Sequence, residues 1–140
     1  MKNNNPQIKP GFPFRIEVPR FVGDILSMLR KNGFRAFIVG GAIRDALLER
    51  KAFDWDITTD AEVHEVQAVF KGIRQFSLKH KTVTLVHSGI PFEVTTMKGP
   101  DGEVDIYTDL SHRDFTLNAM AYDDKRSIVL DPHDGATDIK

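Results

Sequence analysis

The segment IVGGAIRDALLERKAFDWDIT, residues 38–58, constrains the fold of this 140-residue chain more than any other. An apolar run ends at Gly40-Gly41, a segment with helical spacing follows, and a second run places two aspartates around Trp55. The pattern predicts a strand, a tight turn, a short helix and a second strand. A turn without side chains at this place lets phosphate oxygens approach backbone N–H groups.

The two aspartates are candidate metal ligands. On a strand, Asp54 and Asp56 would project from one face while Trp55 enters the core on the other. Neighbouring carboxylates repel each other unless a cation lies between them, and hard oxygen ligands with solvent access favour Mg²⁺. Arg44, one turn into the preceding helix, is placed to contact phosphate oxygens. A solvated strand face that carries two acids remains the alternative.

A third carboxylate follows in PFEVTT, where Glu93 alternates with the apolar residues Phe92 and Val94. If this strand lies beside FDWDIT, Glu93 meets the two aspartates. Three acids on adjacent strands are the ligand arrangement of a two-metal site for phosphoryl transfer. An exposed acid on a strand is the alternative for Glu93.

Two other phosphate-handling patterns are excluded. The G-x-G-x-x-G of a dinucleotide-binding loop is absent. The segment HRDFTLN contains the H-R-D of protein kinases, but Asn118 follows Asp114 by four positions instead of five, and no D-F-G follows. The chain is also too short for two kinase lobes.

Composition limits the partners. With 19 Lys and Arg against 20 Asp and Glu, the net charge is -1, so a nucleic acid would have to bind a local basic patch. One basic cluster, which either contacts RNA phosphate or is a solvated face, comprises Lys71, Arg74, Lys79 and Lys81. The absence of cysteine excludes disulfides and cysteine-based zinc sites. No apolar run approaches membrane-spanning length, so we expect a cytoplasmic protein without membrane contact.

Strands and helices are mixed along the chain, so periodicity predicts an α/β or α+β domain. Residues 1–17 are predicted to be a loose N-terminal leader, and residues 18–140 to be the folded domain. Thr59 with Glu62 resembles a capping box that opens a helix. Ser88-Gly89 is typical of a hairpin turn between TVTLVH and IPFEVTTM.

Four motifs occur in one order: VGGAIRDALLERKAFDWDIT, FEVTT, DLSHRDFTLNAMAYD and DPHDGATDI. Together they resemble class II tRNA nucleotidyltransferases and bacterial poly(A) polymerases of the polymerase-β nucleotidyltransferase superfamily, over about residues 19–140. The resemblance implies the polymerase-β-like nucleotidyltransferase fold, an α+β domain with a mixed sheet of about five strands and helices on one face. It also implies the catalytic head of a longer enzyme that transfers CMP, AMP or both from CTP and ATP to the 3′ end of tRNA without a template. The base-selecting neck and the tRNA-binding body would follow residue 140.

The resemblance also assigns roles to residues. Asp54 and Asp56 match the metal-binding pair, and Glu93 stands where the family has its third strand acid, which implies a two-metal Mg²⁺ site. The positions that match nucleotide-binding residues of the family are Gly40, Gly41, Arg44, Arg113, Asp114 and Asn118. Of these, Arg113 resembles the phosphate-contacting arginine, and the last two resemble residues at the ribose end. A helix cap at Asp114 and a backbone contact at Asn118 remain the alternatives.

The chain departs from the family at several positions. Arginine usually stands at His112, and glycine usually stands at Glu49 and at Lys81. Only ten residues separate Lys98 from Asp109, a short loop that resembles enzymes adding only the two cytidines. A poly(A) polymerase and a non-catalytic nucleotide- or RNA-binding module are the rival functions, and the sequence determines neither the added base nor the oligomeric state.

Overall fold

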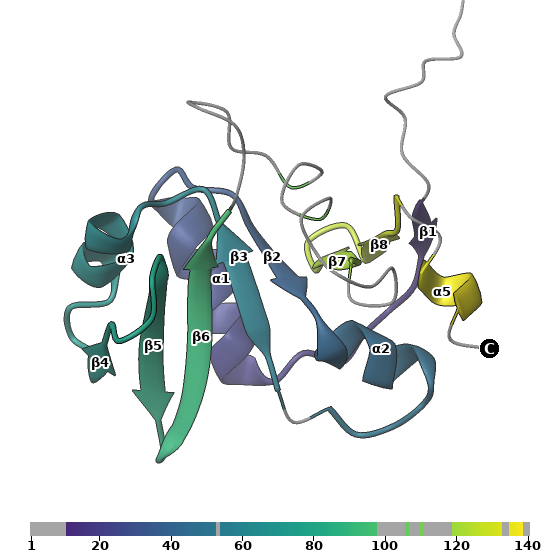
Figure 1. The fold of residues 1–140 in the computed structure, drawn as a ribbon, viewed down its shortest axis with the longest axis horizontal. Helices are drawn as coiled ribbons and strands as arrows, with labels where there is room; N and C mark the ends of the chain where they lie inside the picture. The colour runs from purple at the N-terminus through teal and green to yellow at the C-terminus, as the bar shows by residue number, and fades with distance from the viewer. Residues whose placement is uncertain are drawn as a thin grey trace, which may run out of the picture.

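The computed structural model of the chain describes residues 11–52, 54–97, 106, 110, 119–132 and 135–138. Within these residues eight strands form one mixed sheet in the order β1-β8-β7-β2-β3-β6-β5-β4 (Figure 1). The strands are β1 (Gly11–Pro13), β2 (Ala36–Val39), β3 (Asp56–Thr59), β4 (Gln75–Phe76), β5 (Thr82–His87), β6 (Ile90–Thr96), β7 (Ala121–Asp123) and β8 (Ile128–Leu130). The expected α+β class is confirmed, but about five strands was too few. The strands β1, β4 and β7 are two or three residues long, too short to show a periodicity.

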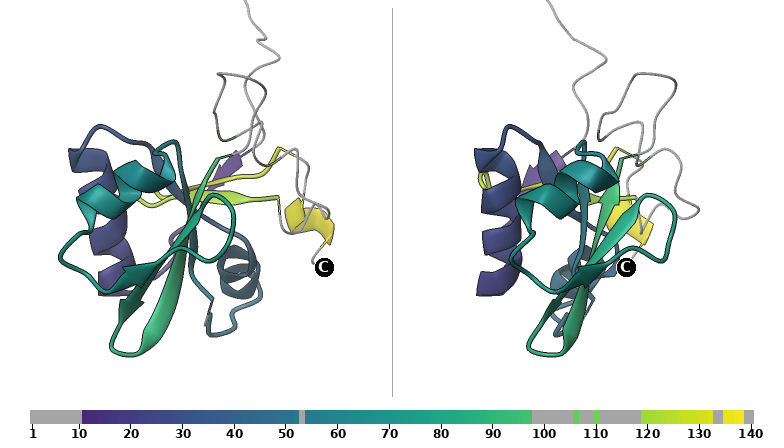
Figure 2. Two further views of the ribbon diagram at one scale, coloured as in Figure 1. Left: turned by 60° about the vertical axis from the view of Figure 1, so that its left-hand side comes forward. Right: turned by 90° about the vertical axis from the view of Figure 1, so that its left-hand side faces the viewer.

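Two helices, one of them the longest in the described residues, cover one face of the sheet. Figure 2 shows α1 (Arg20–Lys31) and α3 (Val63–Val69) together on one side of the strands. The helices α2 (Gly41–Leu47) and α5 (Gly135–Asp138) lie toward the β7–β8 end of the sheet (Figure 1). No helix in the described ranges is long and apolar enough to cross a membrane.

The main core lies between the sheet and α1 with α3. Helix α1 has apolar residues at helical spacing, and one face of it is fully buried: Val22, Ile25, Leu26 and Leu29. The central strands contribute the opposite wall of this core with Ile38, Ile57, Leu85 and Val94. A smaller apolar cluster with Val39, Met97, Ile106 and Leu110 is separate from this core.

The N-terminal segment corrects the predicted leader. Strand β1 pairs antiparallel with β8, with Gly11 opposite Leu130. Ile16 is buried, and its backbone N–H donates a hydrogen bond to the Tyr122 hydroxyl at 3.1 Å. Residues 11–17 therefore belong to the folded domain, while residues 1–10 lie outside the described part. The sequence conceals this strand because its partner lies near the other end of the chain.

The start of α3 differs from the predicted capping box. Glu62 is the N-cap residue, and its backbone N–H donates to the Glu65 carboxylate at 2.9 Å in a reciprocal capping box. Thr59 instead ends β3, and its hydroxyl donates to the Arg35 carbonyl at 2.6 Å. The cap predicted at Thr59 was wrong because β3 extends to Thr59 and α3 begins only at Val63, after its N-cap Glu62.

The β5–β6 hairpin is confirmed. Ser88 and Gly89 connect the strands with φ of 51° and 78°. Positive φ at both central residues is what a type I′ turn needs to match the twist of the flanking strands. The turn sets the register that aligns Thr84 with Glu93.

The two exposed positions where the resemblance implies glycine both adopt a left-handed backbone. Glu49 and Lys81 each have φ of 57°. An ordinary residue there costs about 1–2 kcal/mol, and the greater freedom of glycine in the unfolded chain offsets about 0.4–1 kcal/mol of that. We therefore expect Glu49→Gly and Lys81→Gly each to raise the free energy of unfolding by up to about 1 kcal/mol in urea titrations. As a control, Gln67→Gly on the exposed side of α3 should lower the free energy of unfolding by roughly 0.5–1 kcal/mol. Equal losses of stability in all three variants would contradict backbone strain at Glu49 and Lys81.

Candidate active site

A glycine turn lies directly beside one of the predicted metal ligands. Strand β2 ends at Val39, and Gly40 has a φ of 82° before α2 begins at Gly41. A Cβ atom at Gly40 would lie 3.6 Å from the Asp56 Oδ2 atom. The turn backbone and this carboxylate therefore border the same space, as the spacing of the two motifs implied.

The strand register brings Glu93 to Asp56. Strands β3 and β6 are parallel neighbours with Ile57 opposite Val94. Asp56 and Glu93 each precede these residues by one position, so they lie next to each other on adjacent strands. Because Ile57 and Val94 are buried in the main core, the two acids face away from α1 and α3. The predicted adjacency of the two strands is confirmed.

Asp54 reaches the site from a loop. Strand β3 begins at Asp56, so the prediction that both aspartates lie on a strand was wrong for Asp54. All three acids nevertheless line one cavity of about 280 Å³, together with Trp55 and Pro91. Trp55, the residue between the two aspartates, is largely buried in the main core and so holds the end of this loop against the sheet.

A lysine occupies the charged site in addition to the acids. The Lys79 ammonium donates to the Glu93 Oε2 atom at 2.7 Å. The hydrogen bond and the charge of Glu93, with a smaller contribution from Asp56, raise the pKa of Lys79 against a small opposing effect of desolvation. One cation is thus already paired with one of the three carboxylates. The sequence did not reveal this contact, since no spacing rule connects a loop lysine with an acid on the second strand after it.

The donor chemistry fits a hard divalent cation. Among the described residues no group of three acidic or histidine side chains is already arranged around a metal position. Asp54 and Asp56 present carboxylate oxygens to an open cavity, which is the ligand type that Mg²⁺ prefers. Glu93 would become a further ligand after its ion pair with Lys79 opens.

Arg44 lies against the glycine turn. A Cβ atom at Gly41 would come within 3.1 Å of the Arg44 Nη2 atom, so the guanidinium folds back over this turn. Its Nε and Nη2 atoms donate to the Asp45 carboxylate at 3.3 Å. A phosphate bound at Gly41 would meet a cation that is already in place and held by a neighbouring acid.

The remaining predicted nucleotide-binding residues, Arg113, Asp114 and Asn118, lie outside the described residues, as does His112. Leu110 and Ala119, which precede and follow this segment, are buried and pack with Met97 and Val39. Val39 pairs with Asp56 across β2 and β3, so its side chain shares the face that carries the acids.

Comparisons with known proteins identify the family of the chain. The family model described as "Poly A polymerase head domain" matches residues 36–140. The chain belongs to this family. The head domain is 40% identical over 129 residues to the CCA-adding enzyme of Geobacillus stearothermophilus, an alignment that covers 83% of the chain and 31% of that enzyme. It is 42% identical over 113 residues to the CC-adding tRNA nucleotidyltransferase of Shouchella clausii, with coverage of 80% and 28%.

A solved structure extends the agreement to the fold. The crystal structure of the Bacillus stearothermophilus CCA-adding enzyme in complex with CTP superposes on the head domain with a TM-score of 0.76 at 39% identity. The match covers 88% of this chain and 32% of that one, so the head domain spans about a third of the length of these relatives. The resemblance to class II tRNA nucleotidyltransferases and the expected fold are confirmed.

Proposed function

We propose that the head domain is the catalytic part of a template-independent nucleotidyltransferase that transfers CMP, AMP or both from CTP and ATP to the 3′ end of tRNA. The observation that carries the proposal is the cavity lined by Asp54, Asp56 and Glu93 beside the Gly40-Gly41 turn. The CCA-adding and CC-adding relatives support tRNA as the acceptor. The absence of cysteine is compatible with the cytoplasm, where we expect the enzyme to act.

The acids and the glycine turn have different roles in this reaction. Asp54 and Asp56, with Glu93 assisting, would hold Mg²⁺ in a two-metal site, which supplies activation of the RNA 3′-hydroxyl and neutralisation of the triphosphate. The backbone at Gly40-Gly41 and the Arg44 guanidinium would bind the phosphates of the incoming nucleotide. Together these groups orient the α-phosphate toward the attacking hydroxyl, so positioning contributes much of the catalysis.

Lys79 offsets part of the negative charge of the site before substrate binds. Carboxylates that share a cavity repel one another, and an ammonium at 2.7 Å from Glu93 offsets that repulsion without a metal. Its side chain is largely exposed, so the ion pair is screened and weak enough to open. We expect Arg113 to contact nucleotide phosphate, and Asp114 and Asn118 to lie at the ribose end, as the family resemblance implies.

Incorporation of labelled nucleotide tests the proposal. The full-length protein, incubated with Mg²⁺ and a tRNA that lacks its 3′-terminal CCA, should incorporate CMP from CTP, and EDTA should abolish the incorporation. Addition of ATP after CTP decides between CCA and CC addition, and the short loop before Asp109 favours CC addition. Long tails from ATP alone would identify a poly(A) polymerase. Nucleotide or RNA binding without incorporation would identify a non-catalytic module and overturn the proposal.

A further inference from the structure

An exposed aromatic residue is aligned with the acids across the sheet. Phe76 on β4 is opposite Thr84 on β5, and Thr84 is opposite Glu93 on β6. Residues opposite each other on neighbouring strands share a face, so Phe76 lies on the face that carries Asp56 and Glu93. Its neighbour Gln75 points the other way, because its side-chain amide donates to the Phe70 carbonyl at 2.7 Å. Phe76 is 41% exposed although it is a large apolar side chain.

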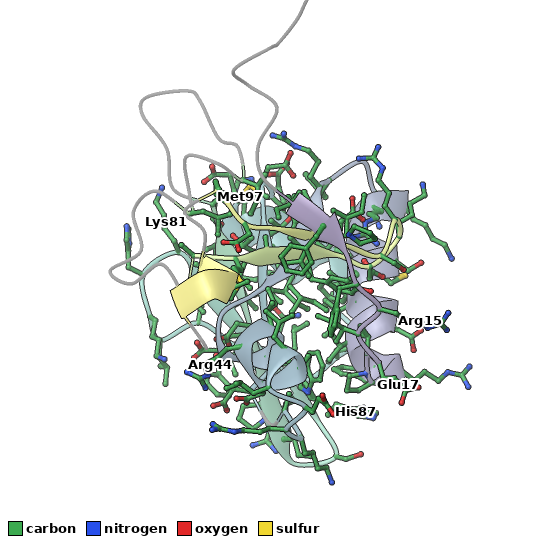
Figure 3. All side chains as sticks on the ribbon, turned by 90° about the vertical axis from the view of Figure 1, so that its right-hand side faces the viewer. Arg15, Glu17, Arg44, Lys81, His87 and Met97 are labelled. Carbon is green, nitrogen blue, oxygen red and sulfur yellow. The ribbon has the colours of Figure 1, made fainter. Side chains whose placement is uncertain are left out.

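The residues around Phe76 form a positively charged segment. Residues 71–81, KGIRQFSLKHK, contain four Lys or Arg and no acid, in a chain whose net charge is -1. Lys79 pairs with Glu93, whereas the described part of the chain shows no ion pair for Lys71, Arg74 or Lys81. Figure 3 shows Lys81 on the side of the molecule away from α1, where Arg44 and Met97 also lie. Positive charge and the aromatic ring therefore border the same face as the acids.

A second apolar side chain stands out in this segment. Leu78 is 85% exposed, two residues after Phe76. Strand β4 is the edge of the sheet, and lysines near an edge strand are a known protection against pairing with another chain. Protection of the edge explains the lysines but not the apolar residues. An exposed phenylalanine and leucine at an edge strand would promote association with another chain.

Aromatic rings next to cations are the chemistry that binds single-stranded nucleic acid. Bases stack on the ring, and the cations contact the phosphates that connect them. Two strand spacings place Phe76 about 10 Å from Glu93. A base stacked on Phe76 would thus belong to a nucleotide upstream of the one whose 3′-hydroxyl reacts. Because the rest of the chain carries an excess of acids, this segment is a local site for a polyanion.

We propose that Phe76 and the basic segment 71–81 bind the unpaired 3′ end of the RNA acceptor and direct it along the sheet into the acidic cavity. The proposal rests on the proposed function, since it identifies where the acceptor strand of that reaction lies. Phe76 stacks on a base of the strand, and Lys81 contacts a phosphate. Neither residue touches the reacting atoms, so both act on binding of the acceptor.

The replacement Phe76→Leu tests stacking in the full-length protein. It should weaken binding of an RNA hairpin with an unpaired 3′ end, measured by fluorescence anisotropy, by about 5-fold or more. The KM for this RNA should rise by a similar factor, while kcat at saturating RNA and the KM for CTP stay unchanged. Phe76→Tyr, which keeps the ring, should bind as the wild type does. Met28→Ala removes a similarly exposed apolar side chain from α1 and is the matched control.

The replacement Lys81→Gln tests the phosphate contact. The slope of the logarithm of RNA affinity against the logarithm of salt concentration should decrease by about 0.7, the value for one phosphate contact with a single strand. The same protein should bind a blunt hairpin without an unpaired end as weakly as the wild type does. An unchanged slope would show that Lys81 does not contact the RNA phosphates and would contradict its part in the proposal.

The two proposals fail in different ways. A wild-type protein that does not incorporate nucleotide at saturating RNA would contradict the proposed function. Normal incorporation combined with wild-type RNA affinity of Phe76→Leu would overturn the stacking proposal alone. The stacking proposal would also be overturned if Phe76→Leu lost the same affinity for the blunt hairpin as for the hairpin with an unpaired end. The same holds if Phe76→Leu changed only the self-association of the protein in sedimentation experiments.

Discussion

Replacement of Asp56 by asparagine should reduce CMP incorporation by at least about 100-fold in the full-length protein. The carboxylate lies beside the Gly40 backbone and next to Glu93, where it would hold the divalent cation and face the triphosphate. Loss of one charged metal ligand removes several kcal/mol of electrostatic stabilisation from a transition state, and each tenfold change in rate corresponds to about 1.36 kcal/mol. Asp54→Ala should have a comparable effect, because both aspartates line the same cavity.

The measurement needs a control for charge and for folding. Asp24 is exposed on α1, on the opposite side of the sheet, so Asp24→Asn should incorporate CMP at the wild-type rate. The far-ultraviolet circular dichroism of each variant should match that of the wild type, since Asp56 is not part of the apolar core. Unchanged incorporation by Asp56→Asn would refute the assignment of the catalytic site.

The replacement Ile57→Ala should have the largest effect on stability, a loss of about 2–5 kcal/mol in the free energy of unfolding. Ile57 is fully buried between Ile38 and Val94 at the centre of the sheet, where the removed methyl groups leave a cavity. The unfolding free energy of a domain is typically about 5–15 kcal/mol, so this loss is a large part of it. Urea titration of the 140-residue chain, followed by fluorescence of its single tryptophan, measures the effect.

A matched isoleucine gives the comparison. Ile90 is 52% exposed at the start of β6, and Ile90→Ala should change the unfolding free energy by no more than about 0.5 kcal/mol. Similar losses of unfolding free energy in Ile57→Ala and Ile90→Ala would contradict the location of the core between the sheet and the helices α1 and α3.

Short-range patterns were sufficient to predict most of the regular elements and to select the three acids that line one cavity. The 3.6-residue spacing in α1 and the alternation in β5 and β6 arise from the direction of each side chain, which local geometry dictates. Gly40-Gly41, Asp54 and Asp56 were found in the same way, because few other contexts place bare turns and paired acids so close together.

Local patterns failed where a contact with a distant part of the chain decided the structure. Thr59 was predicted to cap α3, but it ends β3, and its hydroxyl donates to the carbonyl of Arg35, which directly precedes β2. The segment before Pro19 showed no periodicity, yet β1 completes the edge of the sheet against β8. In both cases the deciding contact comes from a residue distant in sequence.

The amino-acid sequence, read alone, determined the family and the order of the central elements, since these depend on residue type and spacing. Only the folded sheet decided that Lys79 pairs with Glu93, that Asp54 reaches the cavity from a loop, and that Phe76 shares the acid-bearing face. The physical reason is that strand register and the order of strands arise from the burial of all the apolar faces at once, which no local segment specifies.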